Sequence, residues 1–113
     1  IEPDSYVMPH RHRDPAKDES IVCLRGCLGI VVFGPSGQVD RNILLASGGH
    51  NVGVDIPHGV YHTVLALESG TVFFEAKAGP YVPLAGDEKA SWAPVEGDAG
   101  VADYLAQLRR LFD

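Results

Sequence analysis

Short apolar segments, separated by turns rich in glycine and proline, dominate the first two thirds of the chain. Apolar and β-branched runs predict strands at residues 20–24, 28–33, 39–46, 52–56, 60–67 and 71–77. Residues 5–12 alternate more loosely and contain Pro9, so we expect an edge strand or a bend there. About seven short strands at this spacing predict an all-β sandwich or barrel, with strands over about residues 5–84.

The end of the chain changes to a helical pattern. After an irregular stretch at residues 85–97, a helix is predicted over about 98–112, with Asp98 as a candidate N-cap. The apolar residues that recur at helical spacing are Val101, Tyr104, Leu105, Leu108, Leu111 and Phe112. We expect this stripe to pack on a sheet, and a partner interface is the alternative. No linker divides the chain, so a single domain over residues 1–113 is predicted.

Two predicted strands flank the sequence ESG at residues 68–70, which is typical of a hairpin turn. Pairing across such a turn places His62 roughly opposite Glu75, on one face of the ladder. Lys77 shares the parity of Glu75 and should lie on that face too. The hairpin therefore predicts a histidine, a carboxylate and a lysine at one end of an otherwise apolar face.

A pair of histidines precedes the first strong strand. His10 and His12 are two residues apart, so in an extended segment they point to the same side. A solvated polar edge strand would carry the same pair, so the pair alone leaves both interpretations open. Glu19 shares the parity of Ile21 and Cys23, and it faces inward if those two residues enter the core. A lone inward carboxylate is costly unless it meets a cation or a metal ion.

These residues together predict a metal site. Three neutral imidazoles and one carboxylate, from His10, His12, Glu19 and His62, make a first shell for one divalent transition metal, with room for water or substrate. Zinc, iron, manganese, nickel and copper all suit such ligands.

Glu75 and Lys77 are the candidate catalytic residues near the predicted metal. Glu75 could orient His62, act as an extra ligand or serve as a general base, and an exposed strand carboxylate is the alternative. Lys77 could pair with Glu75 or bind an anionic substrate. The sequence pattern does not decide among these roles for Glu75 and Lys77.

Other polar and aromatic residues are weaker candidates. His50 and His58 lie in turn-like stretches, and we expect them to be solvated. Tyr6 and Met8 share the face of His10 and line its pocket or belong to the core. Trp92 is expected to cover an open end of the barrel, with an aromatic platform for a sugar ring as the alternative.

Charge and cysteine content exclude some classes of partner. The net charge is −6, from 9 basic and 15 acidic residues, which argues against binding to nucleic-acid backbones or anionic membranes. No apolar run reaches the roughly 18 residues of a transmembrane helix, and no signal peptide opens the chain. Cys23 and Cys27 do not make a disulfide framework, so we expect reduced thiols in a cytoplasmic protein, with a redox or metal pair as the alternative.

Two motifs resemble those of the cupin superfamily. The stretch HRHRDPAKDESIVCLRG supplies His10, His12, Glu19 and Gly26 in the order of the first cupin motif, with a longer spacer before the glutamate. The stretch PHGVYH supplies the proline, glycine and His62 of the second motif, which departs from the usual pattern in having Asn51 and Ala66 at two flanking positions. The stretches IEPDSYVMPHRH, FFEAKAGPYVPL and SWAPVEG are similar to the WbuC-type cupin metalloproteins.

The resemblance implies a small cupin β-barrel, or jelly roll, with a C-terminal helix, a bound metal and a setting near polysaccharide biosynthesis. It also implies a homodimer and a native segment before the first residue. We therefore expect a metal-dependent enzyme that isomerises, epimerises or oxygenates a small polar molecule such as a sugar derivative. A non-catalytic metal-dependent binding or accessory domain is the alternative, and a barrel without metal is a third possibility.

Overall fold

A computed structural model describes residues 1–113 and contains six strands, a short 3₁₀ helix and one α-helix. In chain order the elements are β1 (Glu19–Arg25), β2 (Cys27–Phe33), β3 (Val39–Ala46), β4 (Gly53–Ile56), β5 (Tyr61–Ala66), β6 (Val72–Lys77), η1 (Gly86–Glu88) and α1 (Val101–Arg110). The apolar segments therefore become strands close to the predicted positions. Residues 5–12 form no continuous strand, and the last strand ends at Lys77, short of the predicted limit near residue 84.

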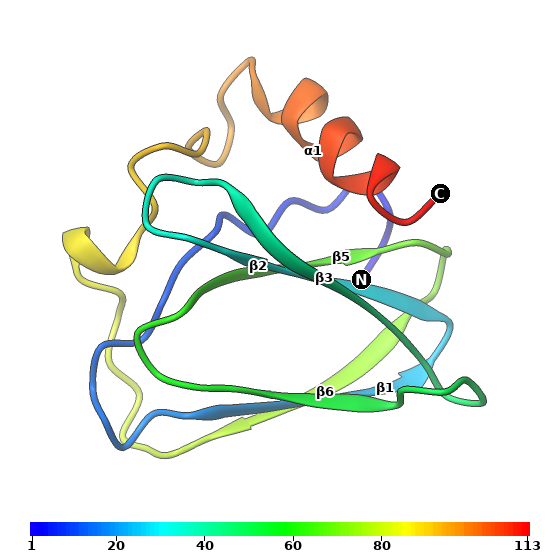
Figure 1. The fold of residues 1–113 in the computed structure, drawn as a ribbon, viewed down its shortest axis with the longest axis horizontal. Helices are drawn as coiled ribbons and strands as arrows, with labels where there is room; N and C mark the ends of the chain where they lie inside the picture. Colours follow the sequence, from blue (N-terminus) through cyan, green and yellow to red (C-terminus); the bar gives the residue numbers. More distant parts are fainter.

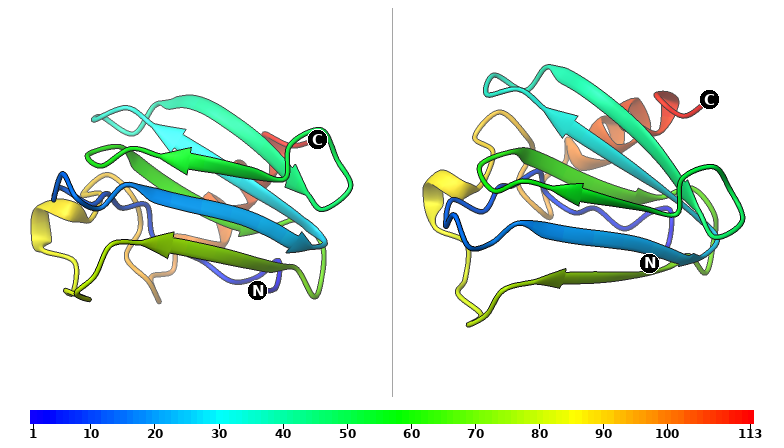
Figure 2. Two further views of the ribbon diagram at one scale, coloured as in Figure 1. Left: turned by 90° about the horizontal axis from the view of Figure 1, so that it is seen from below. Right: turned by 60° about the horizontal axis from the view of Figure 1, so that its bottom comes forward.

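The strands make two antiparallel sheets that face each other as an open sandwich (Figures 1 and 2). One sheet has the order β4-β1-β6 and the other has the order β3-β2-β5. Side chains from both inner faces form a core because alternate residues of each strand point into the space between the sheets. The buried members of this core are Ile21, Cys23, Leu28, Ile30, Leu45, Ile56 and Val64.

Helix α1 covers the outer face of the β3-β2-β5 sheet, as its apolar stripe predicts (Figure 1). Leu105 and Leu108 of the helix pack there with Val31, Phe33 and Leu65. The helix begins after Gly100, so the predicted Asp98 cap is wrong. The Asp98 carboxylate instead accepts a hydrogen bond from the Val95 amide at 3.2 Å, within the preceding turn.

The predicted hairpin between residues 60 and 77 is wrong. Strand β5 pairs with β2, and β6 pairs with β1, so the turn at residues 68–70 crosses from one sheet to the other. The Thr71 hydroxyl lies at this crossing. Its oxygen is 2.8 Å from the Glu68 carbonyl oxygen and 3.2 Å from the Cys27 carbonyl oxygen, and its single proton is shared between these two acceptors. These bonds anchor the turn where β2 begins, and the chain then runs on into the other sheet. His62 consequently lies opposite Val32 instead of Glu75.

The segment before β1 is held by isolated bridges instead of a continuous ladder. His10 pairs with His62 of β5 on one side and with Lys89 on the other. Pro9 has no amide hydrogen to extend this pairing, although its carbonyl accepts a bond from the Ala90 amide at 3.0 Å. The segment therefore lies along the edge of the β3-β2-β5 sheet at the level of His62.

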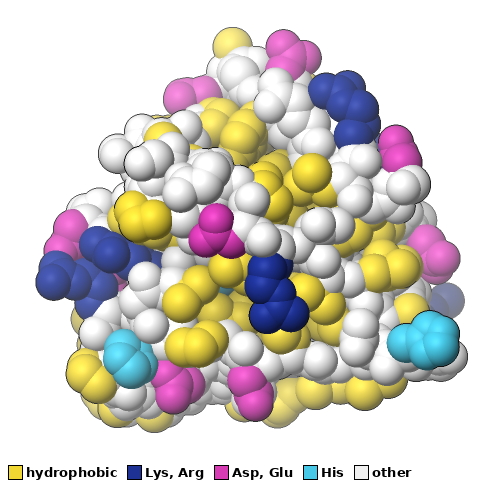
Figure 3. Space-filling model, in the orientation of Figure 1, with side chains coloured by type: hydrophobic (Ala, Val, Ile, Leu, Met, Phe, Trp, Pro, Cys, Tyr) yellow, Lys and Arg dark blue, Asp and Glu magenta, His cyan; other side chains and the backbone are white.

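The surface in Figure 3 mixes exposed hydrophobic side chains with charged groups of both signs. The only α-helix spans 10 residues, and no helix has the length and apolar character needed to cross a membrane.

Candidate metal centre

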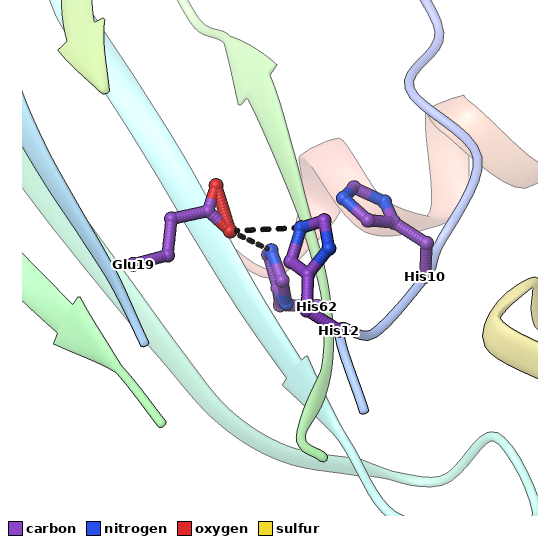
Figure 4. A group of neighbouring side chains, drawn as sticks. All are labelled: His10, His12, Glu19 and His62. Carbon is purple, nitrogen blue, oxygen red and sulfur yellow. Dashed lines mark hydrogen bonds and ion pairs between the residues drawn. The ribbon is translucent and has the colours of Figure 1, made fainter. Parts of the chain in front are cut away.

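Four side chains from three separate parts of the chain meet beside the core (Figure 4). His10 and His12 come from the N-terminal segment, Glu19 begins β1, and His62 lies near the start of β5. One potential ligand atom from each residue lies within 4.8 Å of all the others. The structure thus brings together the complete set predicted from the sequence, in an arrangement that could hold a metal ion.

The backbone fixes the positions of two of these histidines. The His10 amide donates to the His62 carbonyl at 3.1 Å, and the His62 amide donates to the His10 carbonyl at 2.9 Å. A backbone carbonyl also orients each ring. Nδ1 of His10 lies 2.9 Å from the Met8 carbonyl oxygen, and Nδ1 of His62 lies 3.0 Å from the Val60 carbonyl oxygen. A carbonyl only accepts hydrogen bonds, so each Nδ1 carries the proton, which is the usual orientation of a metal-binding histidine.

The third histidine is connected to the turn before β5. The Gly59 amide donates to the His12 carbonyl at 2.6 Å, which joins His12 to the sequence PHGVYH. Gly59 has a φ of +80°, a conformation that glycine adopts without the steric cost met by other residues. The two stretches that carry the histidines are therefore in direct contact.

The contact between Glu19 and His62 is the observation that most strongly favours a bound cation. Glu19 is 2% exposed, and its Oε1 atom lies 2.9 Å from Nε2 of His62. Because Nδ1 of His62 donates to Val60, Nε2 of the neutral ring is a lone pair that faces a carboxylate oxygen. Two acceptors at this distance need a proton or a metal ion between them.

The surroundings of the His12 ring also fit a bound metal ion. Its Nε2 atom lies 3.5 Å from Oε1 of Glu19, and it is buried without a hydrogen-bond partner. A buried polar atom without a partner is rare and costly in folded proteins. A metal ion held between His12 and Glu19 would satisfy both groups.

The protonation states also suit metal binding. Burial, together with the neighbouring His62, lowers the pKa of His10 to about 4, and burial lowers the pKa of His12. Burial opposes ionisation of Glu19, but its interactions with His62 and Glu75 outweigh it and hold the Glu19 pKa at about 2. Near neutral pH His10 and His12 are neutral and Glu19 is charged, which are the forms that bind transition metals.

Glu75 and Lys77 reach the cluster from β6. Lys77 lies opposite Glu19 and Glu75 lies opposite Ile21, so both side chains share the inner face of the sheet with the ligands. The predicted face is therefore correct, although the neighbouring strand is β1 and not β5. Lys77 Nζ lies 2.8 Å from Oε1 of Glu75. Burial and a hydrogen bond with Glu19 raise the Glu75 pKa despite this ammonium group.

The other sequence candidates lie outside the cluster. His50 and His58 are exposed, and Nδ1 of His58 lies 2.8 Å from a carboxylate oxygen of Asp18. Trp92 packs against the apolar residues between α1 and the β3-β2-β5 sheet, with its ring centroid 4.9 Å from that of Phe33. Cys23 and Cys27 are free thiols, the first buried and the second half-buried.

A pocket of about 220 Å³ opens beside the ligands. Its walls include His10, His12, Lys17, Lys77 and Tyr81. Lys17 was not among the predicted site residues. It lies two residues before Glu19, and in an extended segment this spacing points both side chains to the same side. The pocket gives the candidate metal centre a route to small molecules.

Glu88 is a second residue that the sequence pattern missed. One of its carboxylate oxygens accepts a hydrogen bond from the Arg13 amide at 2.9 Å, and its backbone carbonyl accepts one from the Arg11 amide at 2.8 Å. Glu88 therefore holds the chain on both sides of His12. No local sequence signal identifies this role, because Glu88 is about 75 residues away along the chain.

Comparison with known proteins adds one partial match. A family described as Domain of unknown function (DUF6016) matches residues 1–45, which include His10, His12 and Glu19 but not His62. No curated protein and no solved structure matches the chain.

Proposed function

We propose that this chain is a metal-dependent cupin enzyme that acts on a small polar molecule such as a sugar derivative. The observation that carries the proposal is the buried approach of His62 Nε2 to Glu19 Oε1 at 2.9 Å, next to the unpartnered Nε2 of His12. Two facing antiparallel sheets and the motifs around His10 and His62 support a cupin jelly roll of the WbuC type.

His10, His12, Glu19 and His62 would hold one divalent transition metal, such as zinc, iron, manganese or nickel. A metal with these ligands acts as a Lewis acid that polarises a carbonyl or an attached water. The pocket walls beside His10 and His12 would hold the substrate against this centre. Such a polarising centre would serve isomerisation, epimerisation or oxygenation.

Lys77 and Glu75 are the proposed catalytic residues. Lys77 lies in the pocket wall, where its ammonium group would bind or protonate a substrate oxygen. Glu75 holds that ammonium at 2.8 Å and is itself partly exposed, so it would exchange protons with the substrate or with solvent. The polysaccharide setting implied by the sequence resemblance makes sugar derivatives the first substrates to examine.

The test is a turnover screen of the metal-loaded protein against aldoses, ketoses and keto-sugars, followed by NMR. We expect one substrate to react, His62→Ala to abolish turnover, and Glu75→Gln to slow it at least 100-fold, the low end of general acid–base effects. If Glu75→Gln and Lys77→Gln both turn over at the wild-type rate, their catalytic roles are wrong. If no substrate turns over in any metal form, the enzymatic function is refuted.

A metal-dependent binding or accessory domain is the second candidate function. The near-complete burial of Glu19 and His62, each 2% exposed, favours this function because four protein ligands leave few open positions. A metal–ligand shell closed to water, observed in a crystal structure of the loaded protein, would favour binding over catalysis.

The proposed setting is a homodimer in the cytoplasm. The outer face of the β4-β1-β6 sheet exposes Leu24, Val72 and Phe74, which supports association with a second copy. Free Cys23 and Cys27 support a reducing compartment.

A further inference from the structure

All the lysines of this acidic chain lie around one histidine of the candidate centre. The net charge is −6, yet Lys17, Lys77 and Lys89 all line the two pockets that meet at His10. Lys17 and Lys77 belong to the smaller pocket, and Lys89 belongs to a larger one on the other side of His10. Lys17 and Lys77 at the smaller opening create a local positive field that favours anions.

The smaller pocket has two lysines in its walls and no carboxylates. His10, His12, Lys17 and Lys77 line it, and no aspartate or glutamate does. Lys17 Nζ donates to the Pro80 carbonyl at 2.7 Å and to the Ala78 carbonyl at 3.3 Å, so its charge is not neutralised by an acidic partner. An ammonium group has three donors, which leaves one N–H of Lys17 free to bind a ligand.

The larger pocket is mainly apolar and has a volume of about 560 Å³. Tyr6, Met8 and Val95 are among its lining side chains. His10 and Leu84 line both pockets, so the two spaces are neighbours across these residues. A ligand that fills both would place a polar end beside His10 and His12 and an apolar portion against Tyr6 and Met8.

We infer that the ligand of this site is an organic anion with an apolar body, whose carboxylate or phosphate group binds Lys17 beside the metal ligands. This inference rests on the proposed function for the position of the metal and deepens it by naming the class of substrate. Lys77 is already paired with Glu75, so Lys17 supplies the uncompensated charge. Lys89 supplies a further cation at the wall of the apolar space, which also carries the carboxylate of Glu96.

The experiment compares four probes on zinc-loaded protein by isothermal titration calorimetry: hexanoate, hexyl phosphate, neutral hexanamide and acetate. We expect one of the two six-carbon anions to bind at least tenfold more tightly than hexanamide, because a hydrogen bond to a charged partner has about this effect. The tighter anion identifies the carboxylate or the phosphate as the preferred group. Hexanoate should also bind at least tenfold more tightly than acetate, because its additional methylenes enter the apolar pocket.

Variants locate the binding group. Lys17→Met should weaken binding of the preferred anion about tenfold, and Lys17→Arg should restore most of it because the charge returns. Lys89→Gln, at an exposed position, should weaken binding about threefold without disturbing the fold. Arg41→Gln is the matched control, because it removes one exposed positive charge from β3 outside both pockets, and it should leave affinity within twofold.

The outcomes separate this inference from the proposed function. If zinc binds and hexanamide binds as tightly as both anions, the inference is overturned while the metal centre stands. If Lys17→Met and Arg41→Gln weaken binding equally, the assignment to Lys17 is also overturned. If the wild type binds no metal, the proposed function fails, and the same titrations on the metal-free chain still decide whether Lys17 selects anions.

Discussion

Replacing Glu88 with alanine tests whether the contacts around His12 prepare the metal site. Glu88 is not one of the candidate ligands, but its carboxylate accepts 2.9 Å bonds from the amides of Arg13 and Ala85. Glu88→Ala removes both bonds and keeps the bond from the Arg11 amide to the backbone carbonyl. The His12 segment should therefore loosen while the fold is retained.

The expected magnitudes follow from these contacts. Two hydrogen bonds to an exposed carboxylate are lost, which should lower the free energy of unfolding of the metal-free protein by about 1 kcal/mol. In a domain of this size that change lowers Tm by about 4 °C. Loss of a contact that positions a metal ligand weakens metal binding about 10–100-fold. We expect about tenfold, or ~1.4 kcal/mol, because the Arg11 bond remains.

Metal affinity is measured by competition with a chromophoric zinc chelator, and Tm is measured by calorimetry with and without zinc. Glu68→Ala is the matched control, because Glu68 is exposed and its carboxylate makes no hydrogen bond. The control should change stability by less than about 0.5 kcal/mol and leave zinc affinity unchanged. Wild-type zinc affinity in Glu88→Ala, together with the expected loss of metal-free stability, would refute the positioning role.

Two further predictions concern the turn after β1 and the pH response of the metal-free cluster. Gly26 has a φ of +80°, and a Cβ atom there would lie 2.5 Å from the Thr71 hydroxyl oxygen. Gly26→Ala should therefore lower the free energy of unfolding, measured by urea denaturation, by about 3 kcal/mol. Gly48→Ala is the control and should not lower it, because no atom lies within 4 Å of a Cβ at Gly48. Burial and His62 lower the folded-state pKa of His10 from 6.5 to about 4, so the unfolded chain takes up the proton first as pH falls through this window. Metal-free wild type should therefore lose up to about 3 kcal/mol more stability between pH 6.5 and 4 than His10→Gln, and parallel pH profiles would contradict this pKa.

The local pattern predicted the elements and the ligands well. Apolar runs located the strands, and the helical stripe located α1, because both depend on periodicity within a few residues. Parity placed His10 with His12 and turned Glu19 inward, and the structure confirms both orientations. These features depend on side-chain direction along a single strand, which the sequence specifies directly.

Strand partners could not be predicted from the same pattern. The turn before Thr71 has the composition of a hairpin, but the choice between β5 and β1 as the neighbour of β6 depends on contacts far apart in the sequence. The position of Glu88 beside His12 depends on such contacts as well. The inner face of Glu75 was predicted correctly because its parity does not change with the identity of the neighbouring strand.

The most direct test of the candidate metal centre is the metal content of the purified protein after zinc loading and desalting, measured by elemental mass spectrometry. The wild type is compared with His10→Ala/His62→Ala and with the matched control His50→Ala/His58→Ala, whose histidines are exposed and outside the cluster. Circular dichroism establishes that all three proteins are folded. We expect about one equivalent of metal in the wild type and in the control, and none in His10→Ala/His62→Ala. No metal in the wild type, or equal metal in both double variants, would refute a metal site formed by His10 and His62.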